Sequence, residues 1–246
     1  MFVAEPSDRI ESHRYHHSAA GYEPRTHELA ESADEFDKQF RICVVEQPAH
    51  RRRASALIER RYAWRGYAAT PLEPSGDGKM TLSAFVDDTT VATITAGLDG
   101  DAGLYVGSLY PEVVGQLRDS GRKLCEFTKL AVDESVRSQA VLGAIFHVAC
   151  MYVLEVHRCT DALIEVNPRH VRFYQRMLGF TQAAEERLDP EVNAPAVLLR
   201  LDLHHSAREI ARLAGGRRHG RPERSFYPHF FAPEKAAEIV GRLRLH

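Results

Sequence analysis

The chain has 246 residues, of which 44% are hydrophobic and 27% charged, and its formal net charge is −2. This length and composition exclude a largely disordered chain and predict a protein with a sizeable core. A charge so close to zero gives no overall attraction for nucleic acid or anionic membranes, so we expect no nucleic-acid partner.

The start of the chain predicts neither secretion nor a membrane anchor. The segment MFVAEPSDRIESHRYHHSAAGYEP lacks the apolar core of a signal peptide, and no apolar run reaches the roughly 20 residues that cross a bilayer. We therefore expect a cytoplasmic protein without an integral membrane segment. The cysteines form no CxxC pair and no grouping with histidine that would hold a metal. We expect buried thiols and no metal site; the four are Cys43, Cys125, Cys150 and Cys159.

Composition divides the chain into three regions. Residues 1–38 are polar and lack apolar periodicity, which predicts a flexible N-terminal arm. Residues 39–204 alternate between strand and helix patterns. Residues 205–246 hold two helical patterns on either side of the basic segment GGRRHGRPER, so we expect a helical C-terminal extension.

The first half of the central region predicts a strand, a helix and a hairpin. FRICVV, from Phe40, has the β-branched residues of a strand, and residues 49–63 have a helical pattern. The alternating segments 80–86 and 90–98, joined by a short polar turn, are a strong hairpin signal. A short helix follows in YPEVVGQLRDSG.

The second half predicts the longest helix. LCEFTKLAV, residues 124–132, reads as a strand, and the apolar residues of 139–158 recur at spacings of three and four, which is typical of a helix with one buried stripe. The remaining patterns are a short helix after Pro168 and strands at 162–166, 180–183 and 195–203. This order predicts an α/β protein with a mixed sheet and helices on both faces.

The segments EFTKLAVDE and NPRHVRFYQRMLGF, together with this order, resemble the GNAT acyltransferase superfamily. More narrowly, Glu126-Phe127-Thr128-Lys129 and the aromatic, arginine-rich exit RYAWRGY resemble the N-acyl amino acid synthases and the related autoinducer synthases. The resemblance covers about residues 40–203. It implies a mostly antiparallel GNAT-like sheet, an acyl-phosphopantetheine cosubstrate and no permanently bound cofactor.

One departure from the superfamily bears on the acyl donor. CoA-dependent members hold the pyrophosphate on a (Gln or Arg)-x-x-Gly-x-(Gly or Ala) loop at a helix N-terminus. With Gly143 as the central glycine, Ala140 and Ile145 stand where the pattern needs other residues. The poor match favours acyl carrier protein, which brings only a phosphopantetheine arm, over CoA as donor. A degenerate CoA enzyme stays open.

Glu126 is the candidate general base. An α-amino group has a reference pKa near 8 and must lose a proton before it attacks a thioester, and a nearby carboxylate can accept that proton. Glu126 lies in an otherwise apolar strand and, by simple alternation, shares a face with Leu124, Thr128 and Leu130. The alternative is an ion pair with an arginine from the 60s.

Lys129 falls on the opposite face unless the strand bulges, as strands beside active sites often do. It would then grip the acceptor carboxylate or the carrier phosphate; the alternative is a surface lysine. The resemblance implies that Tyr174 protonates the leaving thiolate, with Phe173 as a wall of the acyl site. The alternative is a pair of packed aromatic residues.

The other candidates follow from their positions relative to the donor and the acceptor. Ala131 and Val132 would offer backbone to the pantetheine arm, Asn167 would hydrogen-bond it, and Arg137 would meet the carrier phosphate. For the acyl chain and the acceptor the candidates are Trp64, Arg65 and Tyr67. The structural alternatives are a turn cap for Asn167, core packing for Trp64 and Tyr67, and a solvated side chain for Arg137.

We therefore predict an enzyme that moves a long acyl group from acyl carrier protein to the α-amine of an amino acid. The basic tracts at 51–53 and 217–224 would steer an acidic carrier protein by electrostatic attraction, or they are solvated surface. A CoA-dependent N-acetyltransferase of a small amine and a non-catalytic binding module of the same shape are the other two readings.

Overall fold

The computed structural model describes residues 28–33, 39–63, 66, 71, 72, 74, 76, 78–136, 138–216 and 223–246. In this part of the chain the sheet has the order β1-β2-β3-β4-β5-β6-β9-β7, with β8 paired to β9. Only β5 and β6 pair in parallel; the other pairs are antiparallel. The strands are β1 Glu28–Ala33, β2 Gln39–Val44, β3 Lys79–Val86, β4 Thr89–Leu98, β5 Leu124–Val132, β6 Asp161–Val166, β7 Thr181–Gln182, β8 Arg187–Asp189 and β9 Ala194–Asp202.

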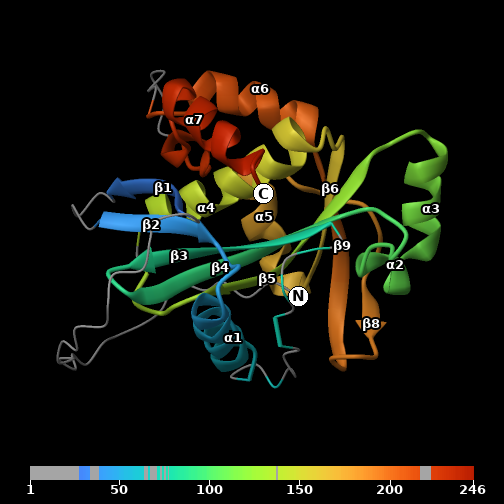
Figure 1. Cartoon of the computed structure of the whole chain (residues 1–246). Coiled ribbons are helices and arrows are strands. Elements are labelled where there is room, and N and C mark those ends of the chain that lie inside the picture. The colour runs from blue at the N-terminus through green and yellow to red at the C-terminus, as the bar shows by residue number, and fades with distance from the viewer. Residues whose placement is uncertain are drawn as a thin grey trace.

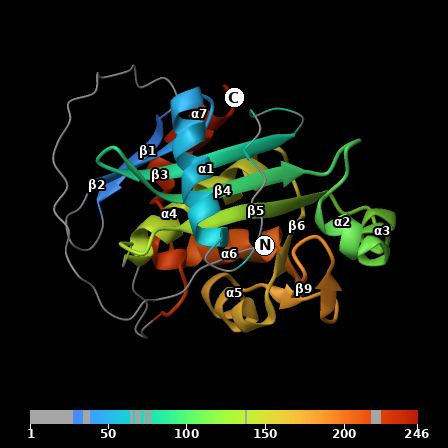
Figure 2. The same ribbon diagram turned by 90° about the horizontal axis from the view of Figure 1, so that it is seen from below.

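Helices cover both faces of the sheet and one end (Figure 1). Helix α1 packs on β4 and β5 and crosses the sheet in the view of Figure 2, whereas α4, α6 and α7 lie on the opposite face. The helices are α1 Pro48–Ala63, α2 Val106–Leu109, α3 Pro111–Asp119, α4 Gln139–Met151, the π-helix η1 Tyr152–Val156, the 3-10 helix η2 Pro168–His170, α5 Val171–Leu178, α6 Leu203–Leu213, the 3-10 helix η3 Tyr227–His229 and α7 Pro233–Leu243. The predicted mixed α/β fold with a mostly antiparallel sheet is confirmed.

Burial follows the alternation of the strands. The main core lies between the sheet and α4, and it extends from Leu29 in β1 to Leu243 in α7. On the other face, Ala54 and Leu57 of α1 form a cluster with Ala131. A further cluster, under α2 and α3, contains Leu124. The sheet is therefore buried on both faces, which explains the long apolar runs in its strands.

Both ends of the described chain differ from the predicted division. Residues 28–33 of the expected flexible arm form β1, which pairs with β2 over Glu28↔Cys43 to Ala33↔Gln39. The prediction of an arm reaching to 38 is wrong for this strand, because its apolar Leu29 and Ala30 enter the main core. The extension predicted from 205 begins with α6 at Leu203.

The C-terminal helices form a second layer over α4. Helix α7 also reaches β1, where the Arg242 guanidinium donates to the backbone oxygen of Leu29 at 3.1 Å. Residues Gln139–Val156, α4 with η1, are long and apolar enough to cross a membrane by composition, but 67% of this window is buried inside the fold. A helix buried between a sheet and a further helical layer is a core helix, and the fold is of the soluble α/β type.

Candidate active site

The candidate site is built where β5 and β6 separate. The two strands pair only over Leu124↔Asp161, Cys125↔Ala162 and Glu126↔Leu163, although β5 runs on to Val132 and β6 to Val166. Beyond Glu126, the edge of β5 that faces β6 has no strand partner among the described residues. Glu126 thus stands at the point where the strands part.

A β-bulge reshapes β5 just after this point. Thr95 pairs with Thr128 and Thr93 with Ala131, so two residues of β5 oppose the single residue between the threonines. Lys129 lies in the bulge with φ 51°, and its carbonyl accepts a hydrogen bond from the Thr93 hydroxyl at 2.9 Å. The sequence did not decide whether β5 bulges at Lys129, and the structure shows that it does.

The bulge shifts the alternation of side chains by one residue. Leu130 enters the main core, whereas Glu126 lies on the other face, with its Cγ within 3.3 Å of where a Cβ on Gly97 would stand. The prediction that Leu130 shares the face of Glu126 is therefore wrong, since simple alternation does not survive an inserted residue.

Glu126 is buried, with 3% of its surface exposed. Its Oε1 accepts the backbone N–H of Tyr105 at 3.0 Å and its Oε2 accepts that of Val106 at 3.1 Å. Burial raises the pKa of the Glu126 carboxyl, and the two hydrogen bonds oppose that rise because they favour the charged form. The carboxylate is thus fixed in place and anchors the loop that begins α2.

Lys129 and Glu126 contact different segments. The Lys129 ammonium donates to the backbone oxygen of Pro71 at 3.3 Å, next to Leu72, which packs against α1. The grip of Lys129 on an acceptor stays a prediction.

A second buried carboxyl, Glu165, was missed at the level of sequence. It lies in β6 with 3% of its surface exposed, and it alternates with Ile164 and Val166 of the main core, so it points to the face of α2 and α3. No donor among the described residues reaches either of its carboxyl oxygens. The signal that could have found it is the one that singled out Glu126, a carboxylate inside an apolar strand, here ALIEV.

Asp189 of β8 completes a group of three carboxyls with Glu126 and Glu165. Burial raises the pKa of Glu165 to about 7, and the negative charges of Asp189 and Glu126 add to that rise. We call Glu126, Glu165 and Asp189 the carboxyl group cluster.

Two tyrosines flank α2, Tyr105 before the helix and Tyr110 after it. The Tyr110 hydroxyl donates to the backbone oxygen of Ala196 in β9 at 2.8 Å. The Tyr105 hydroxyl donates to Glu191 at 3.0 Å. The start of α2 is therefore tied to β5 through Glu126, and its end is tied to β9 through Tyr110.

Tyr174 and Phe173 lie on α5. Tyr174 is 1% exposed and packs edge-on against Phe173 and Phe180, with ring centroids 5.1 and 6.0 Å away. Burial raises the pKa of the Tyr174 hydroxyl well above its usual range, with a smaller contribution from Tyr62 of α1. A raised pKa makes the Tyr174 hydroxyl a weaker acid, and its packing fits the alternative of a core aromatic. Its role toward the leaving thiolate stays a prediction.

Asn167 follows the last residue of β6, and its side chain forms two hydrogen bonds. Its side-chain oxygen accepts the backbone N–H of Arg169 at 3.3 Å, and its amide donates to the backbone oxygen of Pro195 at 3.4 Å. Asn167 therefore caps the turn into α5, the structural alternative that the sequence left open.

Two acidic residues between β5 and α4 form ion pairs with α1. Asp133 pairs with Arg60 at 2.6 Å, and Glu134 forms an ion pair with Arg61, both arginines from α1. Ser138 caps α4 by accepting the backbone N–H of Ala140 at 3.1 Å. The backbone N–H of Ala140, one of those that could bind a phosphate at this helix start, is therefore already bonded to Ser138.

The C-terminal helical layer fills the space beside Gly143. A Cβ on Gly143 would stand 2.8 Å from the Cβ of His229 and 3.3 Å from the backbone oxygen of Phe226. Close packing of η3 on the backbone of α4 is thus a structural reason for glycine here, and contact of Gly143 with the donor stays a prediction.

Ala131 and Val132 are buried and pair through β5 with Thr93 and Ala92 of β4. Their opposite edge is the part of β5 that β6 does not cover. Four further predicted site residues lie outside the described residues; they are Trp64, Arg65, Tyr67 and Arg137.

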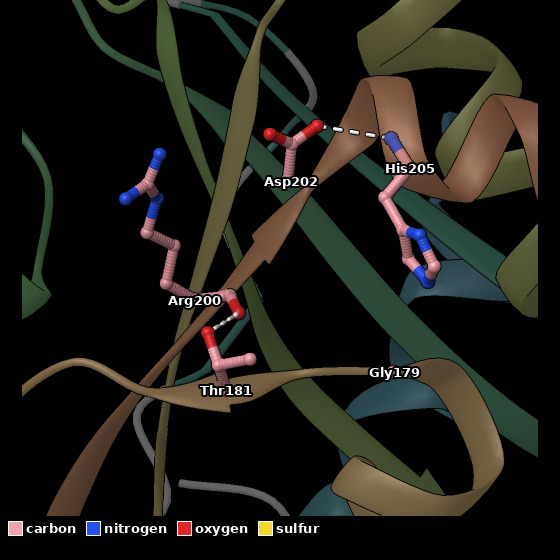
Figure 3. Close-up of a pocket in the computed structure, with 5 residues that line it drawn as sticks. All are labelled: Gly179, Thr181, Arg200, Asp202 and His205. Carbon is pink, nitrogen blue, oxygen red and sulfur yellow. Dashed lines mark hydrogen bonds between the residues drawn. The ribbon is translucent and has the colours of Figure 1, made fainter.

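A polar pocket of about 310 Å³ lies elsewhere, between β7, β9 and α6 (Figure 3). Its polar groups already serve the fold: Arg200 pairs with Asp161 at 2.6 Å, and the Asp202 carboxylate accepts the backbone N–H of His205 at 2.9 Å. None of the predicted site residues lines it; the lining residues are Gly179, Thr181, Arg200, Asp202 and His205. Among the described residues, no group of three metal-ligating side chains is placed to hold a metal ion.

Comparisons with known proteins agree with this architecture. Residues 53–202 match the family "N-acyl amino acid synthase FeeM". The structure of FeeM, an N-acyl amino acid synthase from uncultured soil microbes, is 28% identical, covers 69% of this chain and 93% of its own, and superimposes with a TM-score of 0.62.

More distant structures resemble the chain as well. An acyl-CoA N-acyltransferase from Pseudomonas aeruginosa is 14% identical, with a TM-score of 0.47 and coverage of 65% of this chain and 97% of its own. The AHL synthase LasI is 12% identical, with a TM-score of 0.48 and coverage of 67% and 90%. No curated protein sequence matches. Because the family match spans more than half of the chain and the FeeM structure shares its fold, the chain belongs to the FeeM family of N-acyl amino acid synthases and is an N-acyltransferase with a GNAT fold.

Proposed function

We propose that this enzyme transfers a long acyl group from acyl carrier protein to the α-amine of an amino acid. The observation that carries the choice of donor is the start of α4. There, Ser138 already accepts the backbone N–H of Ala140, and η3 packs on Gly143. Such a start leaves fewer backbone N–H groups for the pyrophosphate of CoA, whereas a phosphopantetheine arm on a carrier protein brings a single phosphate.

The acceptor side rests on the carboxyl group cluster. A free amino acid carries an α-ammonium, and three carboxyls that share one face of the sheet attract a cation. Glu126 is the proposed catalytic carboxylate, predicted from the sequence as the base. Lys129 would hold the acceptor carboxylate by charge pairing.

The donor arm would lie along the uncovered edge of β5, with the backbone of Ala131 and Val132 as its partners. Asn167, at the end of β6, would contact the arm, and Arg137 its phosphate. Tyr174 would protonate the leaving thiolate. The proposed acyl and acceptor walls are Trp64, Arg65, Tyr67 and Phe173.

An acidic carrier protein would be steered by basic surface. Arg52 and Arg53 of α1 are exposed, on the helix that also supplies the arginine partners of Asp133 and Glu134. We propose a cytoplasmic enzyme, since acyl carrier protein and free amino acids meet there.

The test is to offer both donors to the purified protein. Hexadecanoyl-loaded acyl carrier protein and hexadecanoyl-CoA are each incubated with an equimolar mixture of the twenty amino acids, and products are identified by mass spectrometry. We expect N-hexadecanoyl amino acids from the carrier-bound donor, formed at least ten times faster than from CoA. Equal or faster reaction with CoA would overturn the choice of donor. Products on small amines alone would overturn the acceptor.

A further inference from the structure

Burying the Glu165 carboxyl costs folding free energy, which suggests that this residue has a chemical role. Its carboxyl is as buried as that of Glu126, yet it lacks the two backbone N–H partners that hold Glu126. Taking an ionised carboxylate out of water without donors is unfavourable. A proton or a transient cation offsets that cost.

No resident cation fills this role in the described part of the chain. None of its ion pairs includes Glu126, Glu165 or Asp189. Arg187 comes near, with its guanidinium 4.8 Å from the centre of the Tyr110 ring, but it pairs with Glu112. In the described part of the chain, the groups that face Glu165 are acidic or phenolic, and they come from β5, β8 and the segment around α2.

Glu126 and Glu165 also differ in how free they are to exchange a proton. The Glu126 carboxylate is fixed by two N–H groups that stabilise its charge, whereas no donor among the described residues reaches either carboxyl oxygen of Glu165. A base works best when its pKa is close to the working pH, and burial brings the pKa of Glu165 to about 7.

We propose that Glu165 is a further catalytic residue, the group that takes the proton from the acceptor ammonium, while Glu126 and Asp189 provide fixed negative charge around that ammonium. This assignment rests on the proposed function and moves the role of base from Glu126, where the sequence placed it, to β6.

The proton balance of the step is complete. One ammonium proton passes to the Glu165 carboxylate, and the neutral amine attacks the thioester carbonyl, so that a C–N bond forms. The C–S bond then breaks, and the second proton leaves the nitrogen as the thiolate becomes a thiol. Glu165 returns its proton to water, and no further reactant is needed.

The experiment compares Glu165→Gln with Glu126→Gln, and uses Glu238→Gln, an exposed substitution on α7, as the matched control. Thiol release from hexadecanoyl-loaded carrier protein is followed with the amino-acid mixture from pH 5.5 to 9. We expect wild type and the control to lose kcat below a pKa near 7. Glu165→Gln should lower kcat at pH 7 by about 100-fold and recover rate only as the amine itself deprotonates. Glu126→Gln should keep the pKa near 7 at a reduced rate.

Two results would count against the proposal, and they are distinguishable. If wild type forms N-acyl amino acids and Glu165→Gln keeps its rate and pH profile, the assignment of Glu165 fails alone. If wild type forms none, the proposed function fails and the assignment with it. Carbon-13 NMR of glutamate carboxyls gives a second readout: one signal should titrate near neutral pH and vanish in Glu165→Gln, and a Glu165 signal that titrates below pH 5 would overturn the proposal.

Discussion

Glu126 and Leu163 are the last residues at which β5 and β6 pair. One residue further, the two strands part, so the Glu126 carboxylate is held at the apex by the sheet and by the N–H groups of Tyr105 and Val106. The pairing with β6 holds its backbone, and the two N–H groups hold its carboxylate. Substituting Glu126 therefore tests both the position and the charge of this side chain.

Glu126→Gln should lower acyl transfer by about 100-fold or more at saturating substrates, within the usual range for a catalytic carboxylate. The amide can accept one of the two N–H groups and leaves the other unpaired, so the free energy of unfolding should also fall by about 1–3 kcal/mol. Steady-state rates and urea unfolding measure the two effects. Glu59→Gln, exposed on α1, is the control, and full activity of Glu126→Gln would remove this residue from the mechanism.

Gly143→Ala tests the packing of the C-terminal layer. The new methyl would stand 2.8 Å from the His229 Cβ, so we expect a loss of about 1–3 kcal/mol of stability from overpacking. Gly241→Ala in α7 is the matched control, because nothing lies within 4 Å of its added Cβ; it should gain roughly 0.5–1 kcal/mol from helix propensity. A Gly143→Ala enzyme with unchanged melting temperature and weakened donor binding would instead support the donor-cradle interpretation.

Lys129 can be tested by separating its backbone from its side chain. Its φ of 51° strains any residue except glycine, so Lys129→Gly should be more stable than Lys129→Ala by about 1 kcal/mol. If the ammonium grips the acceptor, both variants should raise KM for the amino acid alike. Thermal melting and KM measured on the pair decide this, and an unaltered KM in both variants would make Lys129 a structural residue.

Glu165 should make stability depend on pH. Its pKa rises from 4.5 to about 7 on folding, so the folded protein binds this proton more tightly than the unfolded chain. The stabilisation is complete below pH 4.5 and is lost as pH rises through 7; for a shift of this size it amounts to roughly 3 kcal/mol. Urea unfolding between pH 5 and 8.5 should therefore show wild type losing stability that Glu165→Gln retains. Parallel curves for the two proteins would contradict the raised pKa.

Periodicity predicted most of the fold. The hairpin of β3 and β4, the long helix α4 and the strands β5, β6 and β9 follow directly from alternation and from spacings of three and four, because these elements bury continuous apolar faces. Strand β1 was missed since ELAESA is short and half polar, and its burial depends on pairing with β2 and on contact with α7, which no local pattern records.

The site was only partly within reach of the sequence. The sequence showed that Lys129 could reach the site only if β5 bulges. That such a bulge also turns Leu130 to the main core follows only from the pairing of β5 with β4. Glu165 escaped because its importance depends on Asp189 and Glu126, which come from other strands. The packing of Gly143 against His229 could not be foreseen either, because His229 lies 86 residues later in the chain.

The layer formed by α6, η3 and α7 has a consequence for where this protein can be cut. The family match ends at residue 202, one residue before α6 begins, yet the side chains of η3 and α7 belong to the same core as β1 and α4. A fragment trimmed at that boundary would expose the outer side of Gln139–Val156 to water. We expect such a fragment to aggregate or to adsorb to lipid. The residues after 202 thus belong to the same folding unit as the matched domain and cover its apolar helix.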